Sequence, residues 1–310
     1  MEERMNEDQQ EMTYEESVEF LRNYIGASEK SQAAVAQELG VSASALSSFL
    51  AGKYKTPHTL IPKIRELKTT KEKRADMLSA PPYVETSITR KVLSAIRYSH
   101  LRGALSVAYG DAGVGKTQAY KHYLQDNALA IGITASPTYA SITGVNELLA
   151  EQLNVREHVS RRITREIVYR LKGSGRVILV DEAQHLTTRT LDHLRCIADE
   201  AGIGICLIGN EQVYTRLRGS GKADFAQLYS RIGMRMEVLN KQIGREDVAA
   251  VFFDARLKED ALDLLYRVCQ TGHSLRGAVN VYINTAAAFG PDGVSAGTLA
   301  KMMREMNIGR

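Results

Sequence analysis

The sequence lacks a hydrophobic run long enough to cross a membrane. A helix that spans a bilayer needs about 20 consecutive apolar residues, and no segment of these 310 residues approaches that length. The first residues are acidic, whereas a secretory signal opens with basic residues and continues with an apolar stretch. We therefore expect a cytoplasmic protein with no membrane partner.

Cysteine is also scarce. The three cysteines, Cys196, Cys206 and Cys269, are far apart and form no C-x-x-C pair. A disulfide framework or a structural zinc site needs cysteines or histidines at characteristic spacings, so the sequence argues against both. We expect all three thiols to be reduced residues of the core.

Net charge is low as well, at +4, but the charges are segregated along the chain. Residues 1–19 hold eight acidic side chains and one basic one, residues 53–74 hold eight basic and two acidic ones, and residues 156–176 hold seven basic and two acidic ones. Such segregation favours an anionic partner. The alternative for each segment is a solvated surface without a partner.

The composition is otherwise that of an ordinary globular protein, with 44% hydrophobic and 25% charged residues. The length is sufficient for two or three domains. The acidic residues 1–12 show no periodicity and are expected to form a tail. A charged stretch ends at Asp76, and Pro81 and Pro82 follow, which stop a helix. We therefore expect a domain boundary there, and a helix over residues 86–100 that leads into the second domain.

Residues 32–50 have the pattern of two short helices joined by a tight turn, after a helix expected over residues 14–24. Ala36 is small where the two helices would cross, Gly40 suits the turn, and Ser42 is a good N-cap for the second helix. This pattern resembles the helix-turn-helix of phage repressor-type DNA-binding domains. A helical hairpin of another kind is the alternative.

The second helix of this pair, residues 42–48, contains only Ser, Ala and Leu. It lacks the Arg, Asn and Gln side chains that make bidentate contacts to guanine or adenine edges. The nearby lysines would instead meet phosphates, which supply affinity but little sequence information. We expect a module that binds DNA without sequence preference or docks to protein.

A glycine-rich segment, residues 110–117, reads G-x-x-x-x-G-K-T. Residues 104–109 predict a strand before it and residues 118–125 a helix after it, which is the setting of a phosphate-binding loop. Lys116 would reach the β and γ phosphates of ATP, and the Thr117 hydroxyl would ligate Mg²⁺. The expected nucleotide contacts are Gly110, Gly113, Val114, Gly115, Lys116, Thr117 and Gln118, and the expected cofactors are ATP and Mg²⁺.

A second nucleotide-binding signal follows the apolar residues 177–180, which predict a strand buried on both faces. Asp181 and Glu182 come directly after it, at the edge where parallel sheets bind ligands. Asp181 would hold Mg²⁺, and Glu182 would orient and activate the attacking water.

Three further residues are candidates for catalytic roles. Asn210, after the predicted strand 203–209, would bind the γ-phosphate or the water, or would simply cap the strand. Arg231, before the predicted strand 234–239, would reach the nucleotide of a neighbouring subunit as an arginine finger, or would form a local ion pair. Arg276, at the start of a predicted helix, would contact the phosphates, or would be a surface arginine.

The basic segment 156–176 is amphipathic, with its apolar residues at helical spacing. Its acids are too few to pair all of its bases, so we favour a DNA-phosphate surface over a salt-bridged outer face. The expected DNA contacts are Arg156, Arg161, Arg162, Arg165, Arg170 and Lys172.

The remaining pattern completes an α/β domain followed by helices. Residues 129–134 predict a strand and residues 141–153 a helix. From residue 244 onward the pattern is helical only, with helices expected over residues 248–253, 261–268, 275–289 and 298–306. We predict that these helices form a small lid.

Taken together, the glycine-rich loop, the Asp181-Glu182 strand, Asn210, Arg231, Arg276 and the helical lid resemble an AAA+ ATPase. Within that group the sequence resembles the target-DNA-binding ATPases of transposons, most closely the transposition protein B family of phage Mu. The segments that carry this narrower resemblance are residues 82–86, 113–117, 181–183, 208–210, 229–232 and 275–276, together with the helix-turn-helix.

The resemblance implies an ATP-dependent DNA-binding ATPase that oligomerises on duplex DNA, with little sequence preference, and delivers it to a transposase. Its expected partners are double-stranded DNA, a transposase and further copies of itself, as a homo-oligomer or helical filament, in the host bacterial cytoplasm if phage-encoded. The basic residues of the N-terminal domain are distributed differently from what the family leads us to expect, so whether this domain binds DNA or protein stays open. A helix-turn-helix transcriptional regulator with an ATPase switch is the main alternative. An AAA+ protein for membrane or secretion work would need neither the DNA-like module nor the basic segment.

The expected fold is therefore an α/β AAA+ P-loop domain with a parallel sheet and a C-terminal helical lid, preceded by a small all-α helix-turn-helix domain. The expected boundaries are 1–12 for the tail, 13–75 for the helix-turn-helix domain, 76–85 for the linker, 86–242 for the nucleotide-binding domain and 243–310 for the lid.

Overall fold

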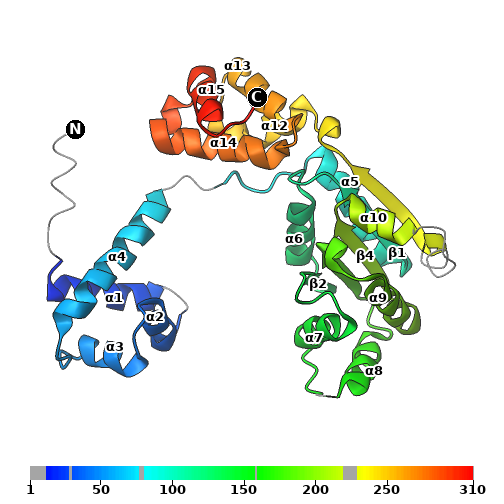
Figure 1. Ribbon diagram of the computed structural model, residues 1–310, viewed down its shortest axis with the longest axis horizontal. Coiled ribbons are helices and arrows are strands. Elements are labelled where there is room, and N and C mark those ends of the chain that lie inside the picture. The colour runs from blue at the N-terminus through cyan, green and yellow to red at the C-terminus, as the bar shows by residue number, and fades with distance from the viewer. Residues whose placement is uncertain (1–11, 28–29, 77–79, 158, 219–228, 310) are drawn as a thin grey trace. The chain divides into compact units, whose positions relative to one another are not determined.

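The computed structural model describes residues 12–27, 30–76, 80–157, 159–218 and 229–309 (Figure 1). The chain divides into two compact units, residues 1–78 and 79–310. Within the described ranges, no helix is both long and apolar enough to span a membrane. The expected acidic tail lies almost wholly outside these ranges.

The first unit is all-helical, as predicted. Its helices are α1 (Tyr14–Ala27), α2 (Gln32–Glu38), α3 (Ala43–Leu50) and α4 (Pro57–Asp76). Ser42 caps α3, because its hydroxyl accepts a hydrogen bond from the Ala45 N–H at 3.2 Å. Gly40, in the turn between α2 and α3, has φ +64°, a left-handed conformation that favours glycine. The two helices of the predicted helix-turn-helix are thus confirmed.

The core of this unit is formed by apolar side chains from all four helices. Leu21 of α1, Leu46 and Phe49 of α3 and Ile64 of α4 are fully buried. The Tyr14 hydroxyl donates a hydrogen bond to the Phe49 carbonyl oxygen at 2.5 Å, which ties α1 to the end of α3. The core therefore depends on α4.

Helix α4 was not among the predicted helices. Its sequence is highly charged and contains Pro62 near its start, two features that hide a helical pattern. Leu60 and Ile64 lie one turn apart and are buried against the other helices. That narrow apolar seam is enough to fix α4 once tertiary contacts exist, because packing rather than propensity stabilises most helices.

The second unit is built on a parallel sheet. The described strands are β1 (Leu105–Gly110), β2 (Ala130–Thr134), β3 (Val177–Asp181), β4 (Gly204–Gly209) and β5 (Ile232–Val238), in the order β2-β3-β4-β1-β5. Every neighbouring pair is parallel. The central strands β3 and β4 are buried throughout, which explains their continuous apolar sequence. The carboxyl ends of β1, β3 and β4 therefore meet at one edge.

Helices cover this sheet and connect its strands. They are α5 (Ser87–Arg102), α6 (Lys116–Asp126), α7 (Ile142–Gln152), α8 (Ser160–Leu171), the 3₁₀ turn η3 (Ala183–His185), α9 (Thr188–Ala201) and α10 (Glu211–Arg218). The large core between the sheet and the helices includes Leu149, Ile167, Ile178, Val180 and Leu194.

The C-terminal part of the second unit contains only helices, as predicted. Its elements are η4 (Asn240–Gln242), α12 (Arg245–Val251), η5 (Phe253–Ala255), α13 (Glu259–Cys269), α14 (Ser274–Phe289), η6 (Pro291–Gly293) and α15 (Ala296–Glu305). Asp247 of α12 accepts hydrogen bonds from the Ser87 N–H at 2.7 Å and the Ser87 hydroxyl at 2.6 Å. In Figure 1 these helices lie at the end of the unit opposite to α7 and α8.

One sequence-based expectation about the core is wrong. Cys206 and Cys269 are buried, and burial raises the pKa of each thiol to about 12. Cys196 is exposed instead. It lies on α9 next to Arg195, on the outer side of a helix whose inner side holds Leu194 and Ile197.

Candidate nucleotide-binding site

The glycine-rich loop follows β1 directly and leads into α6. Gly110, Gly113 and Gly115 all have positive φ, at +142°, +79° and +107°. A Cβ atom on Gly110 would lie 1.9 Å from the Val238 carbonyl oxygen, so this position accepts no side chain. The loop is therefore a backbone cradle at a helix N-terminus, which fits a phosphate group.

Lys116 is the first residue of α6, and its ammonium group lies at this cradle. It donates hydrogen bonds to the carbonyl oxygens of Gly110 at 3.0 Å and Asp111 at 2.6 Å. Burial lowers the pKa of Lys116, while the carboxylates of Glu182 and Asp181 act in the opposite direction. A phosphate in the cradle would replace the two carbonyl partners with negatively charged oxygens.

Thr117 and Asp181 come together although 64 positions separate them in the sequence. Burial raises the pKa of Asp181, which is 3% exposed, and hydrogen bonds from the Thr117 hydroxyl and the Glu182 N–H lower it. The Glu182 N–H lies 3.0 Å from Asp181 Oδ1. A hydroxyl and a carboxylate beside a phosphate cradle are oxygen ligands of the kind that Mg²⁺ prefers, so the residues present fit the expected cation.

Glu182 follows β3 in a left-handed conformation, with φ +55°. Such a conformation is costly for a residue with a side chain, and it is found most often at functional sites. The Glu182 carboxylate accepts a hydrogen bond from the side-chain amide of Gln184. Gln184 also lines the cavity described below. No pattern in the sequence indicated a role for this side chain.

Asn210 follows β4 and lies at the same edge of the sheet. Its N–H donates a hydrogen bond to Gln184 Oε1 at 3.2 Å, and its own Oδ1 accepts one from the Gln212 N–H at 2.9 Å. Asn210 therefore caps α10 and also lines the cavity. This position is compatible with both alternatives for Asn210, a contact to the γ-phosphate or the water and a cap at the strand end.

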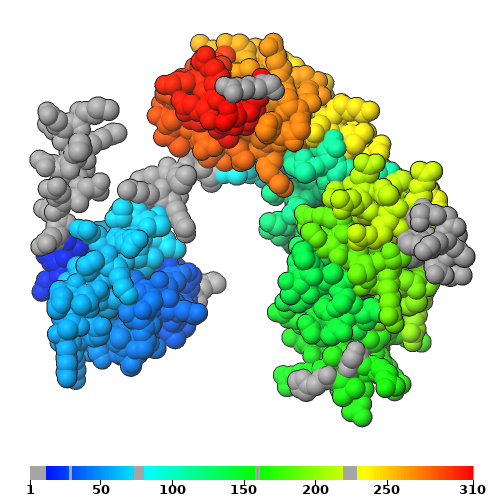
Figure 2. Space-filling model, in the orientation of Figure 1, coloured from blue at the N-terminus to red at the C-terminus, as the bar shows by residue number. Residues whose placement is uncertain are grey.

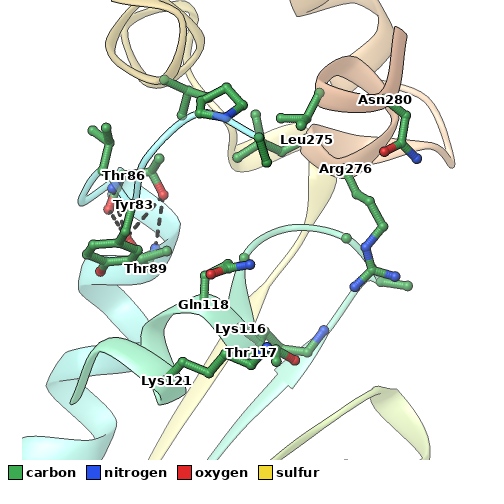
Figure 3. Close-up of a pocket in the computed structure, with 18 of the residues that line it drawn as sticks. Tyr83, Thr86, Thr89, Lys116, Thr117, Gln118, Lys121, Leu275, Arg276 and Asn280 are labelled. Atoms are coloured by element: carbon green, nitrogen blue, oxygen red, sulfur yellow. Dashed lines mark hydrogen bonds between the residues drawn. The ribbon is translucent and has the colours of Figure 1, made fainter. Parts of the chain in front are cut away.

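The lid contributes Arg276, which lies near the start of α14. Its N–H donates a hydrogen bond to the Gly113 carbonyl oxygen at 3.1 Å, so the lid touches the loop directly. Figure 3 shows the Arg276 side chain extending from α14 toward Lys116. The two positive groups face the same space, where a bound anion would contact both.

These elements enclose a cavity of about 510 Å³. The phosphate loop and Glu182 line one part, and residues 80–84 with lid side chains line the other. Leu275, Val279 and Ile283 make the lid side apolar, which suits a purine ring, whereas the loop side suits phosphates. In Figure 3, Tyr83 and Leu275 lie on this side of the pocket.

This apolar half of the cavity was not predicted from the sequence. Tyr83 stacks on His122 of α6, with ring centroids 4.1 Å apart, and this contact holds residues 80–84 beside the loop. The helical spacing of Leu275, Val279 and Ile283 was visible in the sequence. Nothing in that spacing distinguishes side chains that line a ligand cavity from side chains of a core.

Arg231 is exposed and lies just before β5. Ile232 pairs with Leu105 at the start of β1, whereas the phosphate loop follows the end of β1. Arg231 is therefore at the amino end of the parallel strands, whereas the cavity of its own chain lies at their carboxyl ends. The preceding Tyr229 is held in place, since its hydroxyl lies 3.0 Å from that of Tyr214 and the Arg235 guanidinium lies 4.0 Å from its ring centroid.

The six predicted DNA contacts lie in and around α8, and we call them the α8 basic surface: Arg156, Arg161, Arg162, Arg165, Arg170 and Lys172. All six are exposed. Tyr169 among them is 76% exposed. Helix α8 packs against α7 and α9 beyond the edge strand β2. In Figure 2 this green segment forms the lower end of the unit.

One member of the α8 basic surface departs from the expectation of unpaired arginines. Arg170 forms an ion pair with Glu166 at 2.8 Å, and it also donates a hydrogen bond to the Leu153 carbonyl oxygen at 2.8 Å. This arginine fastens the end of α7 to α8 and has less capacity for an outside partner. The spacing of four residues to Glu166 could have revealed the pair.

A polar contact deeper in the structure fixes the position of α8. The buried Asn146 of α7 donates a hydrogen bond to the Thr164 hydroxyl at 2.9 Å, and its Oδ1 lies 2.9 Å from His193 Nε2 of α9. Burial lowers the pKa of His193. The basic side chains are thus mounted on a helix whose orientation is set by both neighbours.

In the first unit, the exposed side of α3 carries Ser44 and Ser47, with Ser42 just before it. Lys53 and Lys55, which follow this helix, are exposed. The structure thus places small side chains where a recognition helix would meet bases, and lysines where phosphates would lie.

Comparison with known proteins identifies a matching family model and several relatives of this chain. A family model for an AAA domain matches residues 100–217. The chain is 30% identical to the Mu-like prophage FluMu DNA transposition protein B of Haemophilus influenzae over 270 residues, which cover 84% of this chain and 93% of that protein. It is also 30% identical to the ATP-dependent target DNA activator B of Escherichia phage Mu over 261 residues, 83% of each chain.

Among solved structures, domain III of the Thermotoga maritima replication initiation protein DnaA matches with a TM-score of 0.48 and 15% identity, covering 73% of this chain and 95% of that one. The AAA domain match contains the phosphate loop, β3 and β4. Together with the parallel sheet, it confirms the predicted AAA+ α/β fold.

Proposed function

The chain belongs to the family of phage Mu transposition protein B, and from this membership we propose that it is an ATPase that assembles on duplex DNA when bound to ATP and delivers that DNA to a transposase. The observation that carries the proposal is the meeting of Lys116, Thr117, Glu182 and Arg276 around one cavity, with Asp181 hydrogen-bonded to Thr117 behind it. A site of this composition is suited to phosphoryl transfer from a nucleotide.

In this proposal each residue at the sheet edge has a separate task. Lys116 and the loop N–H groups bind the β and γ phosphates, and Thr117 with Asp181 holds Mg²⁺. The cation supplies positive charge beside the phosphates. Glu182 orients the attacking water and accepts its proton, and Asn210 supports the water or the γ-phosphate.

Two arginines couple the nucleotide to the lid and to a neighbouring copy. Arg276 joins the lid to the phosphates, so that the lid angle follows the nucleotide state. Arg231, at the far edge of the sheet, serves the nucleotide of a neighbouring copy as an arginine finger. ATP then lies between two copies and favours their assembly, and hydrolysis weakens the contact between them.

We assign DNA binding to the α8 basic surface. Phosphate contacts supply affinity without sequence information, and their number is multiplied when copies assemble on one duplex. The small side chains on α3 agree with weak reading of bases. Delivery to a transposase rests on the names of the relatives, one of which is a target DNA activator.

The proposal also divides the chain by task. Residues 13–75 form the helix-turn-helix domain, residues 86–242 bind and hydrolyse ATP, and residues 243–310 form the lid. The alternative is a helix-turn-helix regulator whose ATPase acts as a switch. It requires base-reading side chains on α3, where the exposed positions hold serine and alanine.

DNA affinity measured with ATP, with ADP and without nucleotide tests the proposal. Several unrelated duplexes of equal length would be compared over a range of salt concentrations. We expect similar affinity for every sequence, tight binding with ATP only, and a loss of about 1,000-fold or more between ~50 and ~200 mM salt. Nucleotide-independent binding to a single sequence would instead support the regulator.

A further inference from the structure

We propose that Gln184 is a positioning residue for ATP hydrolysis, which holds the Glu182 carboxylate and links it to the end of β4. The inference rests on the proposed role of Glu182 as the residue that activates water. Gln184 belongs to η3, the 3₁₀ turn that follows β3. Its side chain lies between the two strand ends that carry Glu182 and Asn210.

The two ends of the Gln184 side-chain amide make hydrogen bonds to two different residues. Its Nε2 donates a hydrogen bond to Glu182 Oε2, and its Oε1 accepts one from the Asn210 N–H at 3.2 Å. A neutral side-chain amide supplies donors at its nitrogen and an acceptor at its oxygen. The contact uses Oε2 of the carboxylate, so we assign Oε1 to the attacking water.

The backbone around Gln184 is built to hold this side chain. Its carbonyl oxygen accepts a hydrogen bond from Arg216 Nη1 of α10 at 2.9 Å, and the same nitrogen contacts the Leu186 carbonyl oxygen. A Cβ atom on Gly209, at the end of β4, would lie 2.4 Å from Gln184 Oε1. The glycine at this position therefore leaves the space that the amide occupies.

Restraint matters here because Glu182 has a left-handed backbone and is partly exposed to the cavity. Without the amide, its carboxylate would be free to rotate between several conformations. A misplacement of about 1 Å in a catalytic group can reduce the rate by about 100-fold. Because the same amide also accepts a hydrogen bond from Asn210, a shift of the end of β4 would change the orientation of the Glu182 carboxylate.

Two substitutions separate this role from a packing role. Gln184→Ala removes the hydrogen bond, and Gln184→Glu keeps the shape but places a carboxylate against the carboxylate of Glu182. We expect kcat to fall by about 10- to 100-fold in Gln184→Ala, and at least as far in Gln184→Glu. A packing role predicts the reverse order, because glutamate fills the space that alanine leaves empty.

The measurements are kcat, KM, the dissociation constant for ATP and the thermal unfolding midpoint of the full chain. We expect ATP affinity within about threefold of the unsubstituted protein, because Gln184 acts on Glu182 and not on the phosphates. His185→Ala is the matched control, since His185 is the exposed neighbour in the same turn. It should leave all four quantities unchanged.

The double variant Glu182→Gln plus Gln184→Ala completes the test. It should hydrolyse ATP no more slowly than Glu182→Gln alone, since Gln184 acts through Glu182. A further loss in the double variant would overturn the inference, as would a Gln184→Ala variant with unchanged kcat. Normal hydrolysis by Glu182→Gln would remove the premise about Glu182 itself, and that result is distinct from the other two.

Discussion

The nucleotide cavity and the α8 basic surface belong to the same compact unit, but they are built in different ways. The cavity collects residues from the ends of β1, β3 and β4, from residues 80–84 and from the lid. The basic surface comes from one helix and its flanks. The first depends on the sheet topology, whereas the second depends mainly on local sequence.

This difference predicts how each region responds to substitution. Members of the cavity have separate tasks and fixed neighbours, so the loss of one of them should stop a step. In our proposal, members of the basic surface share one task, the neutralisation of phosphates, so their effects should be graded and should depend on salt. Three variants test this difference.

The largest effect is expected for Glu182→Gln. The amide cannot accept the proton of the attacking water, so hydrolysis should fall by about 100- to 10,000-fold. ATP should still bind, and the protein should then stay on DNA for longer. Single-turnover hydrolysis and the lifetime of the DNA complex measure the two parts. Rapid turnover by this variant would exclude Glu182 from the chemistry.

Lys116→Ala should have the next largest effect, this time on binding. The ammonium group at the cradle would supply charge-assisted hydrogen bonds to the phosphates, so ATP affinity should fall by about 100-fold or more. ATP-dependent DNA binding should be lost with it. Titration with a fluorescent ATP analogue measures the affinity, and Lys258→Ala, on the exposed start of the lid helix α13, is the control. DNA assembly that persists with ATP would contradict the assigned role.

The smallest effect is expected on the α8 basic surface. Changing Arg161, Arg162 and Arg165 to alanine together should weaken DNA binding by about 10- to 100-fold and reduce the salt slope by about 3. ATP affinity should not change. The ion-paired Arg170 should contribute less than any of these three when changed alone.

The matched control for this triple variant removes three exposed positive charges from the lid, at Lys258, Arg267 and Arg304. DNA affinity and its salt dependence, measured on both triple variants, separate a local surface from general attraction. Equal losses in the two variants would show that net charge, rather than the α8 basic surface, binds the DNA.

Much of the cavity was predictable because its signals are local. The glycine-rich loop needs three positive φ values close together, and a strand buried on both faces reads as a run of apolar residues. Gln184 illustrates the limit. Its amide matters because β3 and β4 are neighbours and because Gly209 leaves room, and both facts lie outside the segment that contains Gln184.

The errors have the same origin. Cys196 is exposed although it lies between the core residues Leu194 and Ile197, since the burial of a helical residue depends on which side the sheet covers. Helix α4 has a charged sequence with a proline. Its few apolar residues can be identified as a buried face only when the core that they complete is known. Each case needed knowledge of a partner distant in sequence.

Four features could be found without a structure: the phosphate loop, the acidic strand end, the helical lid and the concentration of positive charge near α8. These follow from short-range rules: backbone conformation, apolar periodicity and the sum of nearby charges. Three further facts came only from the fold: Arg276 faces Lys116, Arg231 lies away from its own cavity, and Gln184 joins Glu182 to Asn210. The physical reason is that strand order and lid packing set these distances, and no local pattern encodes them.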